Sequence, residues 1–468
     1  MFFQRIKTPG IAHVAYIVAE NGLATIVDPG RDVERYLKVL RNNGLRLGWI
    51  LATHRQEDFE MGGATLRRLT GAEIVACDHE YTAHADRRLV DGDEMELAEG
   101  IAIRALHVPG HTPESMAYAV TLADAPEGAW AVFTGDAMFI GDTGRTDLAD
   151  AARTAENAAL LYDHLHAKIL PLGDQALVLP AHGAGSACGG NVADRDHSTI
   201  GIERATNAVA VKSRDAFVRH KASEGLARPP YFRLMEAVNL EGGRTFEDTP
   251  VDWPAPQEFE RRSTAGIVVD TRPAEAFAGG HIPNAYSIWL AGMARYGGWV
   301  ADPATPVYLV ADDPAAMREA RLALARIGHD NVGGALAGGF EAWRNAGLPV
   351  ARSGTIVPRT LADDLGDYAV LDTREAGEVA AGGCIPDAVH VFVGHLEAEI
   401  DGLGLDRDRP VVATCSVGHR GSLAVSILER KGYRNAFNLL GGMTAWKRLG
   451  LPLEEPPSGF AKRMSTGA

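Results

Sequence analysis

The chain has 468 residues, which is too many for one hydrophobic core, so we expect roughly three domains. Its 46% hydrophobic and 23% charged residues are typical of globular proteins. The formal net charge of -15 argues against nucleic acid or an anionic membrane surface as a partner. The four cysteines, Cys77, Cys188, Cys384 and Cys415, have no CxxC spacing, which disfavours a disulfide scaffold or a structural zinc site.

Residues 1–5 lack the long apolar core of a signal peptide, and no apolar run in the sequence is long enough to span a bilayer. We therefore expect a cytoplasmic protein. A homo-oligomer is compatible with the sequence, which leaves the oligomeric state open.

Alternating apolar segments and turn residues predict a series of strands and helices at the start of the chain. These are strands at 11–18, 23–27, 49–52 and 73–76, and helices at 33–42 and 64–70. Asn21-Gly22 between the first two strands is a hairpin signal. A hairpin followed by strand–helix units fits a layered sandwich better than a doubly wound parallel sheet.

A polar loop, Thr53–Gly63, follows the apolar strand at 49–52, and it carries His54 and Asp58 four residues apart. Three further groups of polar residues also follow apolar runs, a position in which α/β enzymes place ligands. These groups contain Gly110-His111-Thr112-Pro113, Thr134-Gly135-Asp136 with the nearby Gly144-Arg145-Thr146-Asp147, and Ala181-His182-Gly183.

Together these motifs resemble the persulfide dioxygenase branch of the metallo-β-lactamase superfamily, over about residues 13–190. The resemblance implies an αββα sandwich that holds one iron(II) per chain through His54, His111 and Asp136. Two histidines and one carboxylate form the facial triad of non-haem iron oxygenases, which leaves three open positions on the metal.

Two positions depart from the superfamily motif His-x-His-x-Asp-His, because Gln56 replaces its second histidine and Phe59 its last. A dizinc hydrolase of this fold uses both of those histidines, whereas the mononuclear iron site uses neither. The hypothesis of a dizinc site therefore loses support, since only Asp58, Asp136 and His182 are left for a second ion. We expect Gln56, Asp58 and His182 to hydrogen-bond to a bound water or ligand.

Arg145 has two interpretations at this point. It either binds a carboxylate of the substrate or pairs with Asp147, and the sequence favours neither.

The second half of the chain contains an internal repeat with an offset near 103 residues. Val268–Arg272 matches Val370–Arg374, and Gly338–Trp343 matches Gly441–Trp446. Alternating strands and helices predict a small parallel α/β domain for each copy. With the Pro-rich stretches near 226–230 and 250–256 as boundaries, we expect domains at 1–245, 250–352 and 355–456, and a loose polar tail from residue 456.

The last copy places a thiol directly after the predicted strand Val411–Thr414. The loop reads Cys415-Ser416-Val417-Gly418-His419-Arg420-Gly421 and leads into a helix. Backbone N–H groups, the helix N-terminus and the charge of Arg420 favour a thiolate at Cys415 and an anion beside it. This loop resembles the active-site loop Cys-x-x-Gly-x-Arg of rhodanese, whose cysteine carries a persulfide.

The middle copy also resembles rhodanese but runs from its strand Val307–Val310 into Ala311-Asp312-Asp313-Pro314. It has no cysteine there, and two acids stand where an anionic sulfur donor would bind. We expect this copy to be inactive, serving as a spacer or an interaction surface.

The combined resemblance implies oxidation of a low-molecular-weight thiol persulfide by O2 to sulfite, coupled to sulfane-sulfur transfer between thiosulfate, sulfite and a thiol through Cys415. Two alternatives stay open, a zinc-dependent thioester hydrolase of the glyoxalase II type and a non-catalytic sulfur-relay protein with a decayed metal site. The sequence does not identify the thiol.

Overall fold

The computed structural model describes residues 1–125 and 128–455. The predicted end of the third domain at residue 456 and the polar tail after it lie outside these residues. Contacts divide the chain into two compact units, of which the first comprises 1–248 with 325–328 and the second comprises 249–324 with 329–468. Both rhodanese-like copies therefore belong to the second unit.

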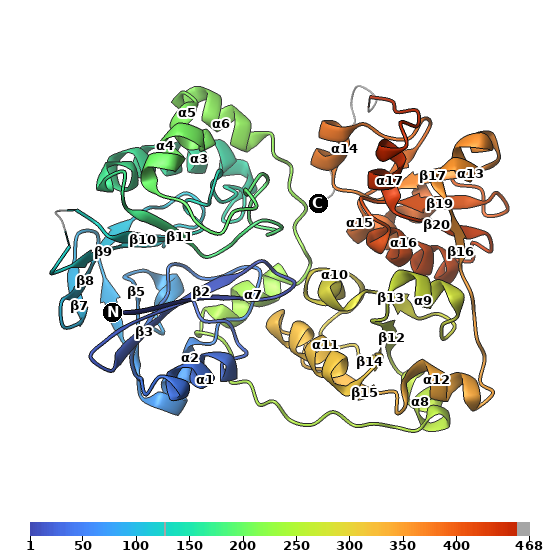
Figure 1. Cartoon of the computed structure of the whole chain (residues 1–468), viewed down its shortest axis with the longest axis horizontal. Helices are drawn as coiled ribbons and strands as arrows, with labels where there is room; N and C mark the ends of the chain where they lie inside the picture. The colour runs from blue at the N-terminus through green and yellow to red at the C-terminus, as the bar shows by residue number, and fades with distance from the viewer. Residues whose placement is uncertain (126–127, 456–468) are drawn as a thin grey trace. The chain divides into compact units, whose positions relative to one another are not determined.

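Two sheets face each other in the first unit (Figure 1). The first sheet has the order β1-β2-β3-β4-β5-β6. Its strands are β1 (Phe2–Lys7), β2 (Val14–Glu20), β3 (Leu23–Val27), β4 (Arg46–Leu51), β5 (Glu73–Cys77) and β6 (Arg87–Leu89). The hairpin of β2 and β3 is antiparallel as the sequence predicts, β3 to β6 run parallel, and β1 is a strand that the sequence analysis did not anticipate.

The second sheet of this unit has the order β11-β10-β9-β8-β7. Its strands are β7 (Glu94–Ala98), β8 (Ile101–His107), β9 (Met116–Leu122), β10 (Ala131–Gly135) and β11 (Leu177–Pro180). The helices of the unit are α1 (Glu34–Asn42), α2 (Gly63–Thr70), α3 (Thr154–His164), α4 (Ile200–Thr206), α5 (Ala208–Val211), α6 (Arg214–Ala222) and α7 (Phe232–Asn239).

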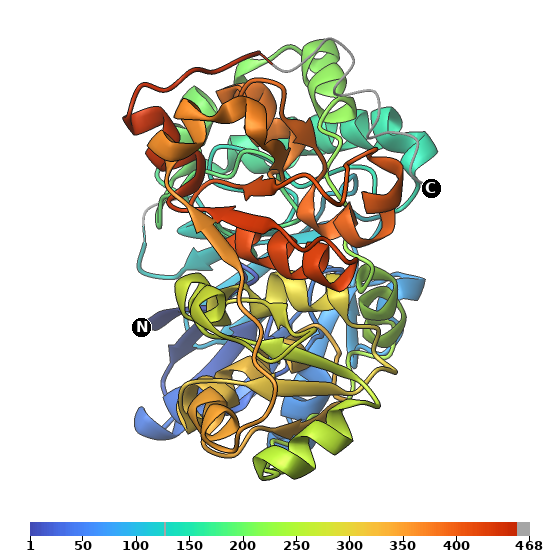
Figure 2. The same ribbon diagram turned by 90° about the vertical axis from the view of Figure 1, so that its right-hand side faces the viewer.

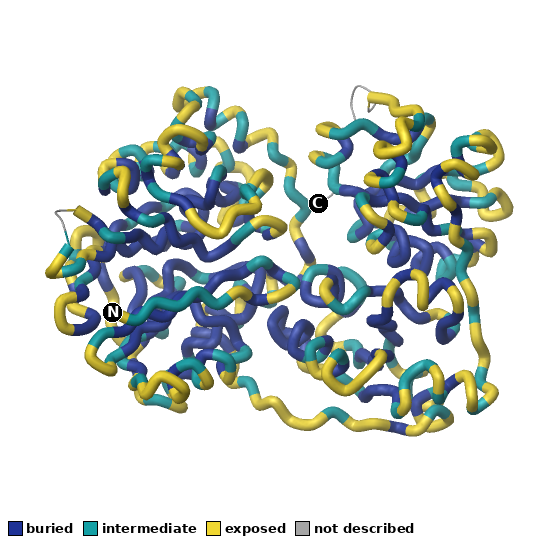
Figure 3. The backbone as a smooth tube through the Cα atoms, in the orientation of Figure 1, coloured by how far each residue is buried: buried dark blue, intermediate teal, exposed yellow. Residues whose placement is uncertain are grey.

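Three apolar clusters hold these layers together. One lies between the sheets and includes Tyr16, Tyr118 and Phe133. A second joins the first sheet to α1 and α2, and a third joins the second sheet to α3 and α6. Strands β2, β3, β9, β10 and β11 are mostly buried, while β1 is half-buried and the outer faces of the helices are exposed (Figure 3). This is the predicted αββα sandwich.

The second unit contains two parallel sheets with helices on their faces (Figures 1 and 2). The middle copy has the strand order β13-β12-β14-β15. It comprises α8 (Pro256–Ser263), β12 (Ile267–Asp270), α9 (Ala274–Gly279), β13 (Tyr286–Ser287), α10 (Met293–Val300), β14 (Val307–Val310), α11 (Pro314–Arg326), β15 (Val332–Ala335) and α12 (Gly339–Asn345).

The last copy adds one strand and has the order β16-β20-β19-β17-β18. It comprises β16 (Gly354–Ile356), α13 (Pro358–Asp363), β17 (Ala369–Asp372), α14 (Ala376–Gly382), β18 (Val389–His390), α15 (Val393–Glu399), β19 (Val411–Thr414), α16 (His419–Arg430), β20 (Ala436–Leu439) and α17 (Gly442–Arg448). The predicted small parallel domains are confirmed. Among the described residues, no helix combines the length and apolar character needed to cross a bilayer.

Candidate functional site

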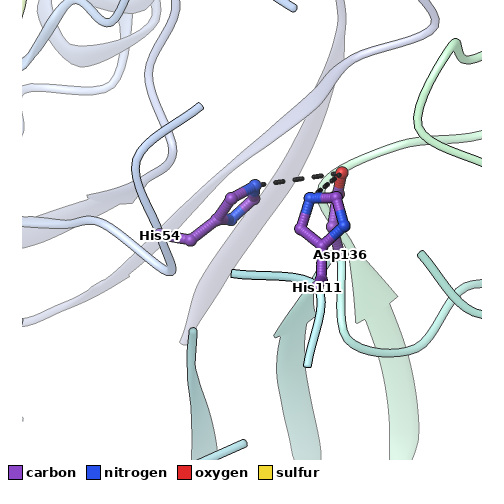
Figure 4. Close-up of side chains that lie close together, drawn as sticks. All are labelled: His54, His111 and Asp136. Atoms are coloured by element: carbon purple, nitrogen blue, oxygen red, sulfur yellow. Dashed lines mark ion pairs between the residues drawn. The ribbon is translucent and has the colours of Figure 1, made fainter. Parts of the chain in front are cut away.

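Three side chains that the sequence places far apart converge in the first unit (Figure 4). His54 follows β4, His111 lies between β8 and β9, and Asp136 follows β10. One ligand atom of each lies within 4.8 Å of those of the other two. The Asp136 carboxylate is 3.8 Å from His54 Nε2 and 3.5 Å from His111 Nε2.

The orientation of His54 is set by a chain of hydrogen bonds from Asp28. The Asp28 carboxylate accepts from the Thr53 N–H and from Thr53 Oγ1, each at 2.8 Å. Thr53 Oγ1 thus donates its proton to Asp28, and it lies 2.9 Å from His54 Nδ1, from which it accepts. The lone pair of His54 is then on Nε2, and burial lowers the pKa of His54 to about 3, so the ring is neutral.

His111 is oriented in the same way through a backbone carbonyl. Its Nδ1 lies 2.8 Å from the carbonyl oxygen of Arg145, which can only accept, so Nδ1 carries a proton and the neutral ring has its lone pair on Nε2. Gly144 permits this approach, because a Cβ there would lie 2.2 Å from the Asp136 carbonyl oxygen and 2.8 Å from His111 Nδ1.

The three converging atoms fit a metal cation. His54 Nε2, His111 Nε2 and Asp136 Oδ2 are all buried, and none has a hydrogen-bond partner. Burying two imidazole lone pairs and a carboxylate oxygen without donors is unfavourable unless a cation binds them.

The side chain of Arg145 donates hydrogen bonds to other groups of the protein. It forms two hydrogen bonds to Asp147, at 2.6 and 2.7 Å, and donates to the carbonyl oxygens of Ala187, Leu226 and Ala227. Of the two interpretations of Arg145, the structure therefore shows the pair with Asp147.

Asp58 and His182 form a second cluster beside the first. His182 lies 2.7 Å from Asp136 through Nδ1 and 2.9 Å from Asp58 through Nε2, and Cys188 completes a group of potential ligands. Burial lowers the pKa of His182, but the two carboxylates outweigh burial and raise it well above its usual range. The His182 ring therefore lies between two carboxylates and contacts both of them.

The two substituted motif positions have structural roles. Phe59 is buried with its ring 4.1 Å from that of His13 and 6.0 Å from that of His182. The Gln56 amide lies 3.4 Å from Nδ1 of His54, on the side of the ring that faces away from the converging atoms. Asn239 of α7 holds this loop by donating to the carbonyl oxygens of Gln56 and Phe59.

The second candidate site is the loop from β19 to α16. Cys415 is buried, and the Gly418 N–H donates to its sulfur at 3.1 Å. Gly418 adopts a φ of 107°, which favours glycine, and it is the residue before α16. Gly421 lets the helix approach Asn438, since a Cβ there would lie 2.3 Å from its amide oxygen. Of the several backbone N–H groups that the sequence predicts around the thiol, this one is seen to donate to the sulfur.

Arg420 is not a free positive charge in this loop. It forms two hydrogen bonds to Glu378 of α14 and a third, at 2.8 Å, to Ser416 Oγ. Burial raises the pKa of Glu378, but Arg420 outweighs burial and lowers it to about 2. An anion near Cys415 therefore competes with Glu378 for Arg420.

The middle copy contributes a side chain beside the loop. The Trp289 ring stacks on His419 with 4.8 Å between the ring centroids. Ser287 Oγ lies 2.7 Å from Ser422 Oγ, so the two copies are joined next to the loop. Val417, at the tip of the loop, is exposed.

Sequence reasoning identified His54, His111, Asp136 and the Cys415 loop, but it missed several residues around them. Asp28 and Glu378 come from other elements of the chain. The sequence signal at Asp28 is the turn Asp28-Pro29-Gly30, and the signal at Glu378 is an acidic residue in the first turn of a helix. Glu57 lies inside the motif itself, and its Oε2 is 3.9 Å from His54 Nε2 and 3.7 Å from His111 Nε2.

Comparison with known families agrees with this division of the chain. Residues 8–182 match the family model of the Metallo-beta-lactamase superfamily, and residues 255–346 and 357–449 each match the Rhodanese-like domain. The chain is a metallo-beta-lactamase domain followed by two rhodanese-like domains. The metal-ligand candidates lie in the metallo-beta-lactamase domain and the Cys415 loop in the second rhodanese-like domain.

Relatives of the metallo-beta-lactamase domain have two kinds of activity in their names. The mitochondrial persulfide dioxygenases ETHE1 of Bos taurus and Homo sapiens are 28% identical over 225 residues, which is 48% of this chain and 81% of theirs. A hydroxyacylglutathione hydrolase of Albidiferax ferrireducens is 36% identical over 130 residues, 28% of this chain and 49% of that protein.

Among solved structures, a metallo-beta-lactamase from Staphylococcus aureus is 26% identical with a TM-score of 0.64. The match covers 72% of this chain and 99% of that one.

Proposed function

We propose that this protein oxidises a low-molecular-weight thiol persulfide with O2 at one iron(II) ion and passes sulfane sulfur through Cys415. The proposed oxidation at iron(II) rests on the convergence of His54, His111 and Asp136, whose ligand atoms are buried and have no hydrogen-bond partner. The likeness to persulfide dioxygenases over 225 residues supports it.

In this proposal His54, His111 and Asp136 hold the iron, which supplies the O2 chemistry when bound. Thr53 and the Arg145 carbonyl fix the two imidazoles in the tautomer that presents Nε2. His182 contacts Asp58 and the oxygen of Asp136 that does not face His54 and His111, so it orients the Asp136 carboxylate. The overall reaction balances as RSSH + O2 + H2O giving RSH + SO3²⁻ + 2 H⁺.

The second reaction uses the Cys415 thiolate as a nucleophile. The thiolate attacks the outer sulfur of thiosulfate, a new S–S bond forms at Cys415, and sulfite leaves with the electron pair of the broken bond. A thiol(ate) then takes the sulfur from Cys415, which returns to the thiolate. Run in reverse, with sulfite as the acceptor, the same steps make thiosulfate from the product of the first site.

Metal content and O2 uptake test the first half. The purified chain is expected to bind one iron(II), with little zinc, and to consume O2 when given a persulfide such as that of glutathione. His111→Ala is expected to abolish O2 uptake and leave sulfur transfer between thiosulfate and a thiol intact, because the sites lie on different domains. Loss of both activities in a folded His111→Ala variant would contradict the two-site proposal.

A zinc-dependent thioester hydrolase is the second candidate, favoured by the 36% identity to a hydroxyacylglutathione hydrolase. It requires more than one metal ion per chain and no O2, so two zinc ions with thioesterase activity would replace the first proposal. A protein that binds no iron in an anaerobic titration and still transfers sulfur would be the relay protein instead.

A further inference from the structure

The loop that follows β4 is held in place by one buried side-chain amide. This amide belongs to Asn239, the last residue of α7, whose side chain is fully buried. Its Nδ2 donates to the carbonyl oxygens of Gln56, at 2.7 Å, and Phe59, at 2.8 Å, and its Oδ1 accepts from the Met61 N–H at 2.9 Å. One side chain thus fixes three backbone groups between residues 56 and 61.

The turn after α7 makes further contacts with the same loop. The N–H and Nε of Arg244 donate to Glu60 Oε1, at 2.7 and 3.0 Å, and Nη2 of Arg244 donates to Glu60 Oε2 at 2.6 Å. Gly243 lies against the backbone of the loop, because a Cβ there would stand 2.1 Å from the Met61 carbonyl oxygen. Residues 239–244 therefore contact the loop through both side chains and backbone.

Asn239 binds the loop at the two positions where the superfamily motif has histidines. Gln56 and Phe59 place no imidazole there, and their backbone carbonyls are the two groups that the Asn239 amide binds. Gln56 also lies beside the first candidate metal ligand, because its side-chain amide is 3.4 Å from His54 Nδ1. The position of the Gln56 backbone therefore affects the surroundings of the His54 ring.

This loop depends on such contacts to keep a single conformation. Residues 53–60 form no helix or strand, so no repeating hydrogen-bond pattern restricts their backbone. Two buried carbonyl oxygens that share one donor are left without a partner when that donor is removed, which is unfavourable. Loss of the amide therefore favours loop conformations in which His54 Nε2 no longer converges with His111 and Asp136.

We propose that Asn239 is a positioning residue for the metal site, which holds the loop in the conformation that directs His54 Nε2 toward His111 and Asp136. This inference rests on the proposed function, which places the metal on these three residues. Asn239 holds the loop in the metal-free chain as well, so the site is formed before the ion binds. It lies outside residues 8–182, the part of the chain that matches the superfamily model.

Metal titration of the full-length chain, stripped of metal, tests this role. Anaerobic iron(II) and cobalt(II) are titrated into wild type, Asn239→Leu and Asn239→Asp, and the visible cobalt(II) spectrum is recorded. Leucine removes all three hydrogen bonds at similar volume, whereas an aspartate keeps the acceptor for the Met61 N–H and loses the amide donors. Both variants are expected to bind the metals about 10- to 100-fold more weakly and to change the cobalt(II) bands.

Hydrogen–deuterium exchange of the metal-free variants gives a second readout, independent of the ion. Amides of residues 56–61 are expected to exchange faster in both variants than in wild type. Amides of β9 and β10 are expected to keep wild-type protection, which reports that the domain is folded.

Asn207→Leu is the matched control, because Asn207 is also a fully buried asparagine of the same domain. Its Nδ2 donates to the carbonyl oxygens of Phe139 and Asp142, and its Oδ1 accepts from the Val209 N–H. Loss of these bonds is expected to lower thermal stability, as in Asn239→Leu, while metal affinity and the cobalt(II) bands stay as in wild type.

Wild-type affinity, bands and loop exchange in the Asn239 variants would overturn the inference and leave the proposed function standing. An equal loss of affinity in Asn207→Leu would also overturn it, because Asn239 would then act through general stability alone. If Asn239→Leu does not fold, Asn239→Asp carries the same comparison. A wild-type chain that binds no metal would overturn both the inference and the proposed function.

Discussion

The two rhodanese-like copies share a framework and differ in one loop. In the middle copy, Arg272 binds Asp270 through two nitrogens and also donates to the Gly280 carbonyl oxygen. In the last copy, Arg374 makes the same bonds to Asp372 and to the Gly383 carbonyl oxygen. The repeated arginine is therefore a structural residue in both copies.

The same correspondence identifies the counterpart of Cys415 in the middle copy. Thr271 Oγ1 donates to the Val310 carbonyl oxygen, as Thr373 Oγ1 does to that of Thr414. The next residues, Ala311 and Cys415, are therefore equivalent.

The loops after these residues differ in length and charge. Helix α11 begins three residues after Ala311, whereas α16 begins four residues after Cys415. The middle loop carries Asp312 and Asp313 and has no counterpart of Gly418. The acid of the last copy is also missing, because the third residue of α9 is Ala276 and that of α14 is Glu378.

This difference shows that the framework and the chemistry of these copies are separable. The arginine–aspartate pair and the parallel sheet persist where the thiol, the loop glycine and the Arg420–Glu378 pair are all absent. The middle copy keeps its fold and places Trp289 on His419 of its neighbour. We propose that the middle copy shapes the loop of the last copy and carries out no chemistry of its own.

The largest expected effect is that of Cys415→Ser, which should abolish sulfur transfer because serine cannot carry sulfane sulfur at neutral pH. Thiosulfate should add about 32 Da to the wild-type chain, mapped to Cys415 by peptide mass spectrometry, and nothing to the variant. Burial raises the pKa of Cys384 and Cys188 and raises that of Cys77 to about 12, which disfavours their thiolates. Cys384→Ser is the control and should be labelled like wild type; a persulfide on Cys384 would contradict the assignment.

The next largest expected effect is a loss of stability that is equal in the two copies. Arg374→Ala and Arg272→Ala each leave a buried aspartate without its partner, which should destabilise the local sheet by about 3–5 kcal/mol. Hydrogen–deuterium exchange should then rise in β17 and β19 for Arg374→Ala and in β12 and β14 for Arg272→Ala. If hydrogen–deuterium exchange rises in only one copy, the arginine–aspartate pair does not stabilise the two copies equally.

Arg420→Ala should slow sulfur transfer by about 10- to 100-fold, the loss of one charge-assisted contact of about 1.5–3 kcal/mol to the anion. Part of the loss should come from Glu378, whose carboxylate then faces the loop unpaired. The double variant Arg420→Ala, Glu378→Ala should therefore be faster than Arg420→Ala alone. Equal rates for the two variants would show that Glu378 does not oppose the anion.

Trp289→Ala should have a smaller effect, because a stacked aromatic pair contributes about 0.5–1.5 kcal/mol. We expect KM for thiosulfate to rise about two- to tenfold with kcat nearly unchanged, since the ring contacts His419 rather than Cys415. Trp299→Ala, which removes a ring that packs against Phe392 and His395 away from the loop, is the matched control. If Trp289→Ala and Trp299→Ala have the same KM and kcat, the middle copy does not influence the loop through Trp289.

The smallest expected effect is no effect at all. Ala311→Cys in the Cys415→Ser background restores a thiol at the equivalent strand end, but without Gly418, Arg420 or their loop. Thiosulfate should add no sulfur to Cys at position 311, because Asp312 and Asp313 repel the anion. A mass increase there would show that the thiol alone distinguishes the two copies.

The sequence by itself determined the parts whose information is local. Apolar runs ended by polar motifs gave the strand ends at His54, Asp136 and Cys415, and the hairpin of β2 and β3 followed from Asn21-Gly22. The repeat of Asp-Thr-Arg and Gly-Gly motifs gave two domains of one kind. These features are readable because strand length, turn residues and motif spacing depend on neighbours in the chain.

Only the tertiary structure decided which side chains meet. Residues in a loop have no fixed period, so the sequence did not show that Glu57 faces the imidazoles while Gln56 faces away from them. The pairing of Arg420 with Glu378 joins residues 42 positions apart, and the stack of Trp289 on His419 joins two domains. Such contacts depend on where separate strands end in space, which the packing of the sheets sets and local sequence does not.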